Sequence, residues 1–329
     1  MKAVRITRPG GPGVLELVDL EPPEPGPGEV AVEGLCTALN RADLLQRAGR
    51  YPAPPGAPSD IPGLEYAGIV ASAGRGVSSP LPGDRVMGLV PGGAYAERVV
   101  VAADQTIPIP ANLDFVRAAA LPEACFTAWD ALRQAEFEAG ESVLVHAAGS
   151  GVGTAALQLA RALGASRILG TASPGKLAAI AAAGLPLDVP IDYEATQDIG
   201  ATIREATGGD GVDVILELVG AVYWATDIAS LAPRGRLVLI GLMSGVRAET
   251  DLGTILRHRL RVIGTVMRTR EAGEKAELAR SVRDELLPRF ADGSIVPVIH
   301  AVMPLANAAE AHAMMEANRN FGKIVLRVS

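Results

Sequence analysis

The chain has few residues of the kinds that form disulfides or bind metals. It contains only two cysteines, Cys36 and Cys125, which excludes a disulfide framework and a Cys-x-x-Cys metal site. We expect both to be small buried residues rather than reactive thiols. The chain has four widely scattered histidines: His146, His258, His300 and His312. Because His146 lies in a predicted strand, we expect core packing or a hydrogen bond near a cofactor rather than metal ligation.

Concentrated positive charge is also missing. The chain has 30 Lys and Arg against 37 Asp and Glu, a formal net charge of −7. Phosphate backbones are bound by concentrated basic surfaces, so we expect no nucleic-acid partner. The short cluster RHRLR at 257–261 is more typical of a solvated helix end that runs into a strand.

Long apolar runs are absent as well. No run reaches the roughly 18 residues that a membrane span requires, so we expect no membrane partner. The opening segment, MKAVRITRPGG, lacks the apolar core of a signal peptide. The expected location is therefore the cytoplasm.

The sequence does contain enough apolar residues for two packed domains, with 49% hydrophobic residues in a chain of 329. In roughly the first 120 residues, short strand-like segments alternate with glycine- and proline-rich turns, which predicts an all-β, barrel-like domain. These segments are KAVRIT, LELVDL, EVAVEGLC, YAGIVASAG, DRVMGLV and AERVVVAA. After Val266 a long helix over 271–290, a strand, another helix and a last strand, GKIVLRV, are expected. The β character of this tail suggests that it returns to the N-terminal domain.

From about Glu141 the pattern changes to apolar strands that alternate with helices. The predicted strands lie in SVLVHAA, SRILGTA, VPIDY, GVDVILELVG, GRLVLIGLM and LRVIGTV. Six strands separated by crossover helices predict a parallel, doubly wound sheet with helices on both faces.

The turn after the first of these strands is rich in glycine. Gly149, Gly151 and Gly153 follow a strand and open a helix, the context of a dinucleotide-binding turn. Glycines there let backbone N–H groups and the positive helix end approach a pyrophosphate. The spacing is imperfect, because Gly-x-Gly-x-x-Gly would place a glycine at Thr154.

The second strand indicates which dinucleotide binds. An NAD site usually places an acidic residue there for the ribose 2′-hydroxyl, about 20 residues after the glycines. No acidic residue occurs from 165 to 187, and the strand instead runs into Ser173 and Lys176. A hydroxyl and an ammonium suit a 2′-phosphate, so NADPH is favoured over NADH. Ser173 could equally cap the following helix, and Lys176 could be an ordinary surface lysine.

Several segments together resemble a known family. They are ALNRADLLQRAGRYPAPPG, PGLEYAGIV, VPGGAYAE, AAALPEACFTAW, HAAGSGVGTAALQLA, IGLM and MEANRNFGKIVL. Over essentially the whole chain they resemble the zinc-free quinone oxidoreductases of the medium-chain dehydrogenase/reductase superfamily, in particular the p53-inducible quinone oxidoreductase subgroup. The resemblance implies an α/β fold with a doubly wound parallel (Rossmann) sheet and a β-rich, GroES-like barrel domain completed by the C-terminal tail. The expected bounds are 1–120 with 266–329 for the GroES-like substrate domain and 121–265 for the Rossmann domain.

The same resemblance explains the missing metal ligands. Zinc alcohol dehydrogenases of the superfamily have a cysteine where this chain has Asn40, and Gly-His-Glu where it has Gly63-Leu64-Glu65. An amide and a leucine do not replace a thiolate and an imidazole at a catalytic zinc. We therefore expect no bound metal.

The resemblance also implies the site residues. The expected cofactor-binding residues are Asn40, Thr127, Gly149, Ser150, Gly151, Val152, Gly153, Ser173, Lys176, Tyr193, Gly241, Leu242, Met243 and Asn318. Asn40 and Thr127 would lie by the nicotinamide and its ribose, residues 150–153 at the pyrophosphate, and 241–243 at the nicotinamide amide. Tyr193 would join Ser173 and Lys176 around the 2′-phosphate, and Asn318 would approach from the tail.

The expected activity is NADPH-dependent, metal-independent reduction of quinones or related conjugated carbonyls, with the cofactor in a cleft between the domains. Tyr51 and Asn40 are the expected catalytic residues, although Tyr51 could simply pack in its proline-rich loop. One alternative is a reductase of 2-enoyl thioesters or enones, and another is an NADPH-binding protein with little turnover. By resemblance the protein would be a homodimer, with GRLVLIGLM as the apolar edge of the sheet.

Overall fold

The computed structural model describes residues 1–328. They form two compact units. The β-rich unit comprises Met1–Phe126 and the tail from Met267 onward, and the parallel-sheet unit comprises Thr127–Val266. Helix α3 (Pro122–Gln134) contains the first boundary between them.

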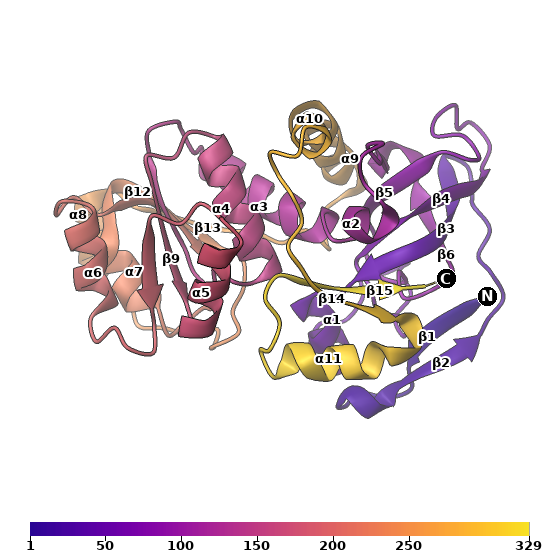
Figure 1. Ribbon diagram of the computed structural model, residues 1–329, viewed down its shortest axis with the longest axis horizontal. Helices are drawn as coiled ribbons and strands as arrows, with labels where there is room; N and C mark the ends of the chain where they lie inside the picture. Colours follow the sequence, from indigo (N-terminus) through magenta and orange to yellow (C-terminus); the bar gives the residue numbers. More distant parts are fainter. Residues whose placement is uncertain (329) are drawn as a thin grey trace. The chain divides into compact units, whose positions relative to one another are not determined.

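The parallel-sheet unit is built on six parallel strands in the order β10-β9-β8-β11-β12-β13. The strands are β8 (Ser142–Val145), β9 (Arg167–Ala172), β10 (Val189–Asp192), β11 (Val212–Glu217), β12 (Leu231–Leu239) and β13 (Arg261–Gly264). The crossover helices are α4 (Gly151–Ala162), α5 (Pro174–Ala182), α6 (Ile199–Ala206), α7 (Trp224–Ser230) and α8 (Leu252–His258) (Figure 1). The order of the strands reverses at β8, because β9 and β10 are added on one side of it and β11, β12 and β13 on the other. The carboxyl ends of β8 and β11 therefore form the switch point where doubly wound sheets bind ligands. The predicted doubly wound sheet is confirmed.

The central strands contain continuous apolar runs because both of their faces are covered. Val143, Leu144 and Val145 in β8 are fully buried, as is the run 214–216 in β11. A strand with only one buried face would instead alternate apolar and polar residues.

The prediction that GRLVLIGLM forms the edge of this sheet is wrong. The segment GRLVLIGLM supplies most of β12, which pairs with β11 on one side and with β13 on the other. The edge is β13, because the short LRVIGTV segment adds one more parallel strand outside β12. Helix α8, which precedes β13 in the chain, exposes Leu252 (73%) and Leu256 (78%), and Val262 in β13 itself is 40% exposed.

The β-rich unit holds a seven-stranded sheet, in the order β14-β15-β3-β4-β5-β7 with β6 paired to β3, and a separate β1-β2 hairpin. Its strands are β1 (Lys2–Ile6), β2 (Leu15–Asp19), β3 (Glu29–Ala38), β4 (Glu65–Ala73), β5 (Arg85–Leu89), β6 (Arg98–Ala102), β7 (Ile107–Pro108), β14 (Ile299–Pro304) and β15 (Lys323–Arg327). Its helices are α1 (Arg41–Arg47), α2 (Phe115–Ala119), α9 (Ala272–Ser281), a π-helical turn at Val282–Leu286, α10 (Leu287–Ala291) and α11 (Ala308–Glu316), with short 3-10 turns at Pro12–Val14, Ala103–Gln105 and Leu305–Asn307.

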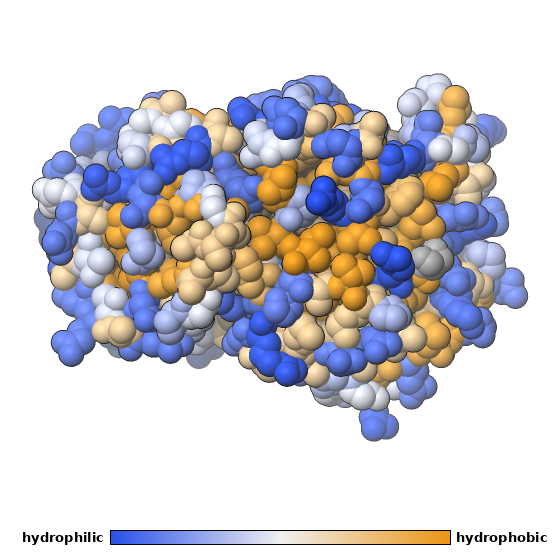
Figure 2. Space-filling model, viewed as in Figure 1, coloured by the Kyte–Doolittle hydropathy of each residue, from blue (hydrophilic) through white to orange (hydrophobic). Residues whose placement is uncertain are grey.

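The tail completes this sheet. Strand β15 runs antiparallel to β3, with Val325 opposite Ala38, and β14 then pairs with β15 at the edge. Figure 2 shows apolar side chains gathered over the region of β14 and β15, where Val302 is exposed. The predicted return of the tail to the N-terminal domain is therefore confirmed.

Among residues 1–328, no helix combines the length and the apolar character needed to cross a membrane.

Candidate functional site

The glycine turn joins β8 to α4 through a tight backbone. The N–H of Ala148 donates to Thr171 O in β9 (2.9 Å), and the N–H of Ser150 donates to Ala147 O (2.9 Å). Ser150 then occupies the N-cap of α4, where its Oγ accepts from the N–H of Gly153 (2.9 Å). The serine at the central position of the glycine motif thus caps the helix.

Two of the glycines cannot be replaced without moving their neighbours. A Cβ on Gly153 would lie 2.4 Å from Ala147 O and 2.7 Å from Ala148 O. A Cβ on Gly149 would lie 2.9 Å from both Cβ and Cδ of Lys176, so the lysine chain lies across this glycine. The first N–H groups of a helix have no intrahelical partner, so the start of α4, including Gly151 and Val152, can hold an anion.

A second group of polar residues lies at the ends of β9 and β10. Ser173 stands at the N-cap position of α5, but its side chain makes no capping hydrogen bond. Tyr193 directly follows β10, is exposed, and donates its N–H to Ala172 O (3.4 Å). With Lys176 across Gly149, the structure brings three of the expected residues to one end of the sheet and provides no carboxylate at the end of β9. These donors suit a dinucleotide that carries an extra phosphate.

The remaining expected residues are distributed over both units. Gly241 follows β12, and a Cβ there would lie 2.5 Å from Leu218 O, so a side chain is excluded. Leu242 and Met243, directly after it, are exposed. Thr127 is buried in α3. Asn318 adopts a left-handed backbone (φ 54°) after α11 and accepts a hydrogen bond from Arg41.

The β-rich unit has a buried polar centre around Glu65. Its Oε1 accepts from Lys323 Nζ (2.7 Å) and from Asn40 Nδ2 (2.8 Å), and its Oε2 accepts from the N–H of Glu123 (2.8 Å). Lys323 Nζ also donates to Asn40 Oδ1 (2.6 Å) and to Leu39 O (2.9 Å). The ammonium of Lys323 therefore lies between Glu65 and Asn40, the residue that stands where the zinc alcohol dehydrogenases have a cysteine.

This arrangement holds Asn40 in one orientation. Its Nδ2 donates to Glu65 and to Ala38 O (3.3 Å), and its Oδ1 accepts from Lys323. Its backbone N–H donates to Asp43 Oδ2 (2.8 Å) at the start of α1. Both amide hydrogens are therefore engaged within the protein.

Arg268 forms hydrogen bonds that hold the loop carrying Tyr51. Its Nε donates to Pro91 O (2.6 Å) and its guanidinium to Tyr51 O (3.2 Å) and Gln46 Oε1 (2.6 Å). The guanidinium also lies 5.1 Å from the centre of the Tyr51 ring, a cation–π contact. Burial raises the pKa of Tyr51, against an opposing effect of Arg268, while Glu123 raises it further. The structure therefore brings together Tyr51, Arg268 and Glu123.

The parallel-sheet unit contains a buried cluster of His146, Glu217 and Asp227. His146 Nε2 lies 2.8 Å from Asp227 Oδ1 and 3.7 Å from Glu217 Oε2, and its Nδ1 lies 2.9 Å from Thr171 Oγ1. Burial lowers the pKa of His146 to about 4 and raises that of each carboxyl to about 7.

Imidazole and carboxylate groups are ligands that zinc binds, and the potential ligand atoms of these three residues lie within 4.8 Å of one another. Neither Glu217 Oε2 nor Asp227 Oδ2 has a hydrogen-bond partner among residues 1–328. One proton shared between the two carboxyl groups would satisfy both oxygens.

The two cysteines are buried, as expected. Burial raises the pKa of Cys36 to about 11 and that of Cys125 to about 12, so both thiols stay protonated near neutral pH.

Sequence analysis did not identify Glu123, Arg268 or Lys323 as site residues. Glu123 reads as an ordinary acid in the first turn of a helix, and Arg268 as one of several arginines after the last parallel strand. Lys323 directly precedes the apolar run IVL in the strand KIVLR, and a lysine at the start of such a strand is the one signal that could have indicated a partner carboxylate.

The strand order, the glycine turn at the switch point and the GroES-like sheet define the class of two-domain, dinucleotide-dependent reductases. Residues 26–111 match the alcohol dehydrogenase GroES-like domain family, and residues 151–282 match the zinc-binding dehydrogenase family. The chain is 37% identical to a quinone oxidoreductase of Pseudomonas aeruginosa over 99% of both chains.

Solved structures agree with these matches. The quinone oxidoreductase of Escherichia coli, solved in complex with NADPH, has a TM-score of 0.88 and 30% identity over the full length of both chains. The JamJ enoyl reductase, in its apo form, has a TM-score of 0.88 and 26% identity over 100% of this chain and 99% of its own. The chain belongs to the medium-chain dehydrogenase/reductase superfamily, in its quinone oxidoreductase branch.

Proposed function

We propose that this protein reduces quinones or related conjugated carbonyls with NADPH and without a bound metal. The observation that carries the choice of cofactor is the end of β9, where Ser173 keeps its hydroxyl out of the helix cap and Lys176 lies across Gly149. The choice of substrate is supported by the relatives that are named quinone oxidoreductases.

The residues of the parallel-sheet unit would hold the cofactor. The start of α4, from Gly149 to Gly153 with Ser150 as its cap, would bind the pyrophosphate. Ser173, Lys176 and Tyr193 would bind the 2′-phosphate by charge-assisted hydrogen bonds. Thr127 and the segment 241–243 would contact the nicotinamide half, together with Asn40 and Asn318 of the β-rich unit. When bound, NADPH supplies the hydride.

The residues of the β-rich unit would orient the acceptor and exclude water. Quinones are electrophilic, so proximity and orientation can supply most of the rate without a Lewis acid. Lys323 already places a positive charge against Asn40 and Glu65, which leaves this group of residues electrostatically satisfied. Asn40, held by these bonds, and Tyr51, held by Arg268, are the proposed catalytic residues.

A second candidate function is reduction of 2-enoyl thioesters, which the likeness to the JamJ enoyl reductase favours. Purified protein should oxidise NADPH with 9,10-phenanthrenequinone and do so far more slowly with crotonyl-CoA. Faster turnover with crotonyl-CoA would support the enoyl reductase instead. No turnover with either acceptor, combined with tight NADPH binding, would support an NADPH-binding protein with little activity.

We also propose that two chains associate through the edge strand β13, where Val262 is exposed, together with the preceding helix α8, where Leu252 and Leu256 are exposed. Apolar side chains this exposed usually mark an interface. Light scattering should then give about twice the 33.9 kDa chain mass. Leu256→Glu should shift the protein towards the monomer, because it would place a carboxylate in an apolar contact. A monomer before any substitution would contradict the proposal.

A further inference from the structure

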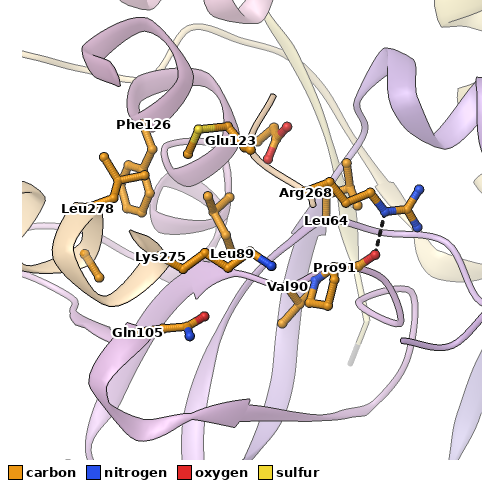
Figure 3. A pocket seen from close by; sticks show the side chains of 12 residues that line it. Leu64, Leu89, Val90, Pro91, Gln105, Glu123, Phe126, Arg268, Lys275 and Leu278 are labelled. Carbon is orange, nitrogen blue, oxygen red and sulfur yellow. Dashed lines mark hydrogen bonds between the residues drawn. The ribbon is translucent and has the colours of Figure 1, made fainter. Parts of the chain in front are cut away.

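The β-rich unit contains a cavity of about 40 Å³ beside Glu123. Most of its wall is apolar, with Leu64, Leu89 and Phe126 among the lining residues. Its polar lining residues are Gln105, Glu123, Arg268 and Lys275. Figure 3 shows the side chain of Lys275 reaching from α9 towards the middle of the cavity, with Glu123 on another side of it.

The size of the cavity indicates what it can hold. A cavity needs roughly 10–15 Å³ for each water, whereas an engineered cavity that binds benzene measures about 150 Å³. This cavity is therefore large enough for water and well below the size of the one that binds benzene. Waters would find donors and acceptors in Gln105, Lys275 and Glu123, as a stable buried water requires.

The surroundings of Glu123 favour its protonated form. Its backbone N–H donates to Glu65 Oε2, and the negative charge of Glu65 acts on its carboxyl group. Burial, and next to it the charge of Glu65, raise the pKa of Glu123 to about 8, and Asp43 acts in the same direction. Lys323 and Arg268 act in the opposite direction, as does the start of α3. The other ionisable groups that face it are Tyr51 and Lys275.

We propose that Glu123 is the general acid of quinone reduction and that the cavity behind it carries water that resupplies its proton. The proposal rests on the proposed function. The quinone accepts a hydride, which is two electrons and one proton, and becomes a hydroquinone monoanion. Glu123 then transfers its carboxylic proton to the anionic oxygen, and the resulting carboxylate regains a proton from solvent through the cavity, past Lys275. The sum is quinone, NADPH and one proton converted to hydroquinone and NADP⁺.

The protonation of Glu123 can be tested without cofactor or substrate. Infrared difference spectra between wild type and Glu123→Gln should show the carbonyl band of a protonated carboxylic acid at pH 6, which disappears by pH 10. Glu277→Gln, the same substitution at an exposed position of α9, should leave the band unchanged. Absence of a band at pH 6 that depends on Glu123 would overturn the proposal.

The proton transfer is tested by the pH dependence of turnover. In wild type, kcat with 9,10-phenanthrenequinone should fall as pH rises through about 8, because only protonated Glu123 can donate. In Glu123→Gln, kcat should be roughly 100-fold lower and should no longer fall over this range. Glu277→Gln should keep the wild-type profile. If Glu123→Gln does not fold, Glu123→Asp should retain the falling profile with a lower rate.

The outcomes separate this inference from the function on which it rests. No quinone turnover by wild type would contradict the proposed function and the role of Glu123 with it. Turnover with the same pH profile in wild type and Glu123→Gln would contradict the role of Glu123 alone. Loss of the profile in Tyr51→Phe and not in Glu123→Gln would assign the proton to Tyr51 and overturn the proposal.

Discussion

Replacing Lys323 with methionine should lower the free energy of unfolding by about 3–5 kcal/mol, one of the two largest effects that we expect. The side chain of Lys323 is 4% exposed and that of its partner Glu65 is fully buried, with 2.7 Å between Nζ and Oε1. Removing the ammonium leaves a carboxylate in the interior with no opposite charge against it. Urea denaturation measures the change.

Two controls test whether the loss of stability comes from breaking a buried ion pair. Lys2→Met makes the same substitution in the Lys2–Asp19 pair, whose side chains are 53% and 81% exposed, and should cost at most about 1 kcal/mol. The double variant Glu65→Gln/Lys323→Met removes both charges and should regain much of the lost stability. Equal losses at Lys2 and Lys323 would contradict the assignment of a buried pair.

Replacing Lys176 with methionine should raise the Kd for NADPH roughly 10- to 100-fold and leave that for NADH unchanged. A hydrogen bond to a charged group contributes about 1.5–3 kcal/mol, and every 1.4 kcal/mol is tenfold in affinity. Ser173→Asp should weaken NADPH binding further, because a carboxylate at the end of β9 would repel the 2′-phosphate and suit a free 2′-hydroxyl. Isothermal titration calorimetry measures both.

NADH is the matched control for both variants, since it differs from NADPH only by the 2′-phosphate. A loss of NADH affinity equal to that of NADPH would indicate that the substitution disturbs the glycine turn, which the lysine chain touches at Gly149. Equal affinity of the wild-type protein for the two cofactors would contradict the proposed preference.

The fold could be predicted because its signals are local. The run VIL at the centre of β11 is apolar because both faces of the strand are covered, and Gly153 in the turn after β8 stands where a side chain would meet backbone oxygens. The order of the strands in the sheet depends on contacts between segments that are far apart in the sequence. The sequence shows that β12 is apolar but not that β13 adds outside it, which is why the expected edge was wrong.

The polar centre of the β-rich unit could not be predicted for a related reason. Lys323 and Glu65 are 258 residues apart, and they meet only because the tail adds a strand beside β3. The raised pKa of Glu123 depends on the same contact. Burial and the charge of Glu65 raise this pKa, and Lys323 holds the Glu65 carboxylate in place. In the parallel-sheet unit, His146 was expected to pack or to form a hydrogen bond, but Asp227, its partner 81 residues away, had no signal.

The most direct test of the proposed function is quinone-dependent NADPH oxidation by protein dialysed against EDTA, with its metal content determined by elemental analysis on the same sample. We expect substoichiometric metal and an unchanged rate with 9,10-phenanthrenequinone. Loss of activity that added zinc restores, or one tightly held metal ion per chain, would contradict metal-free catalysis and would direct attention to the cluster of His146, Glu217 and Asp227.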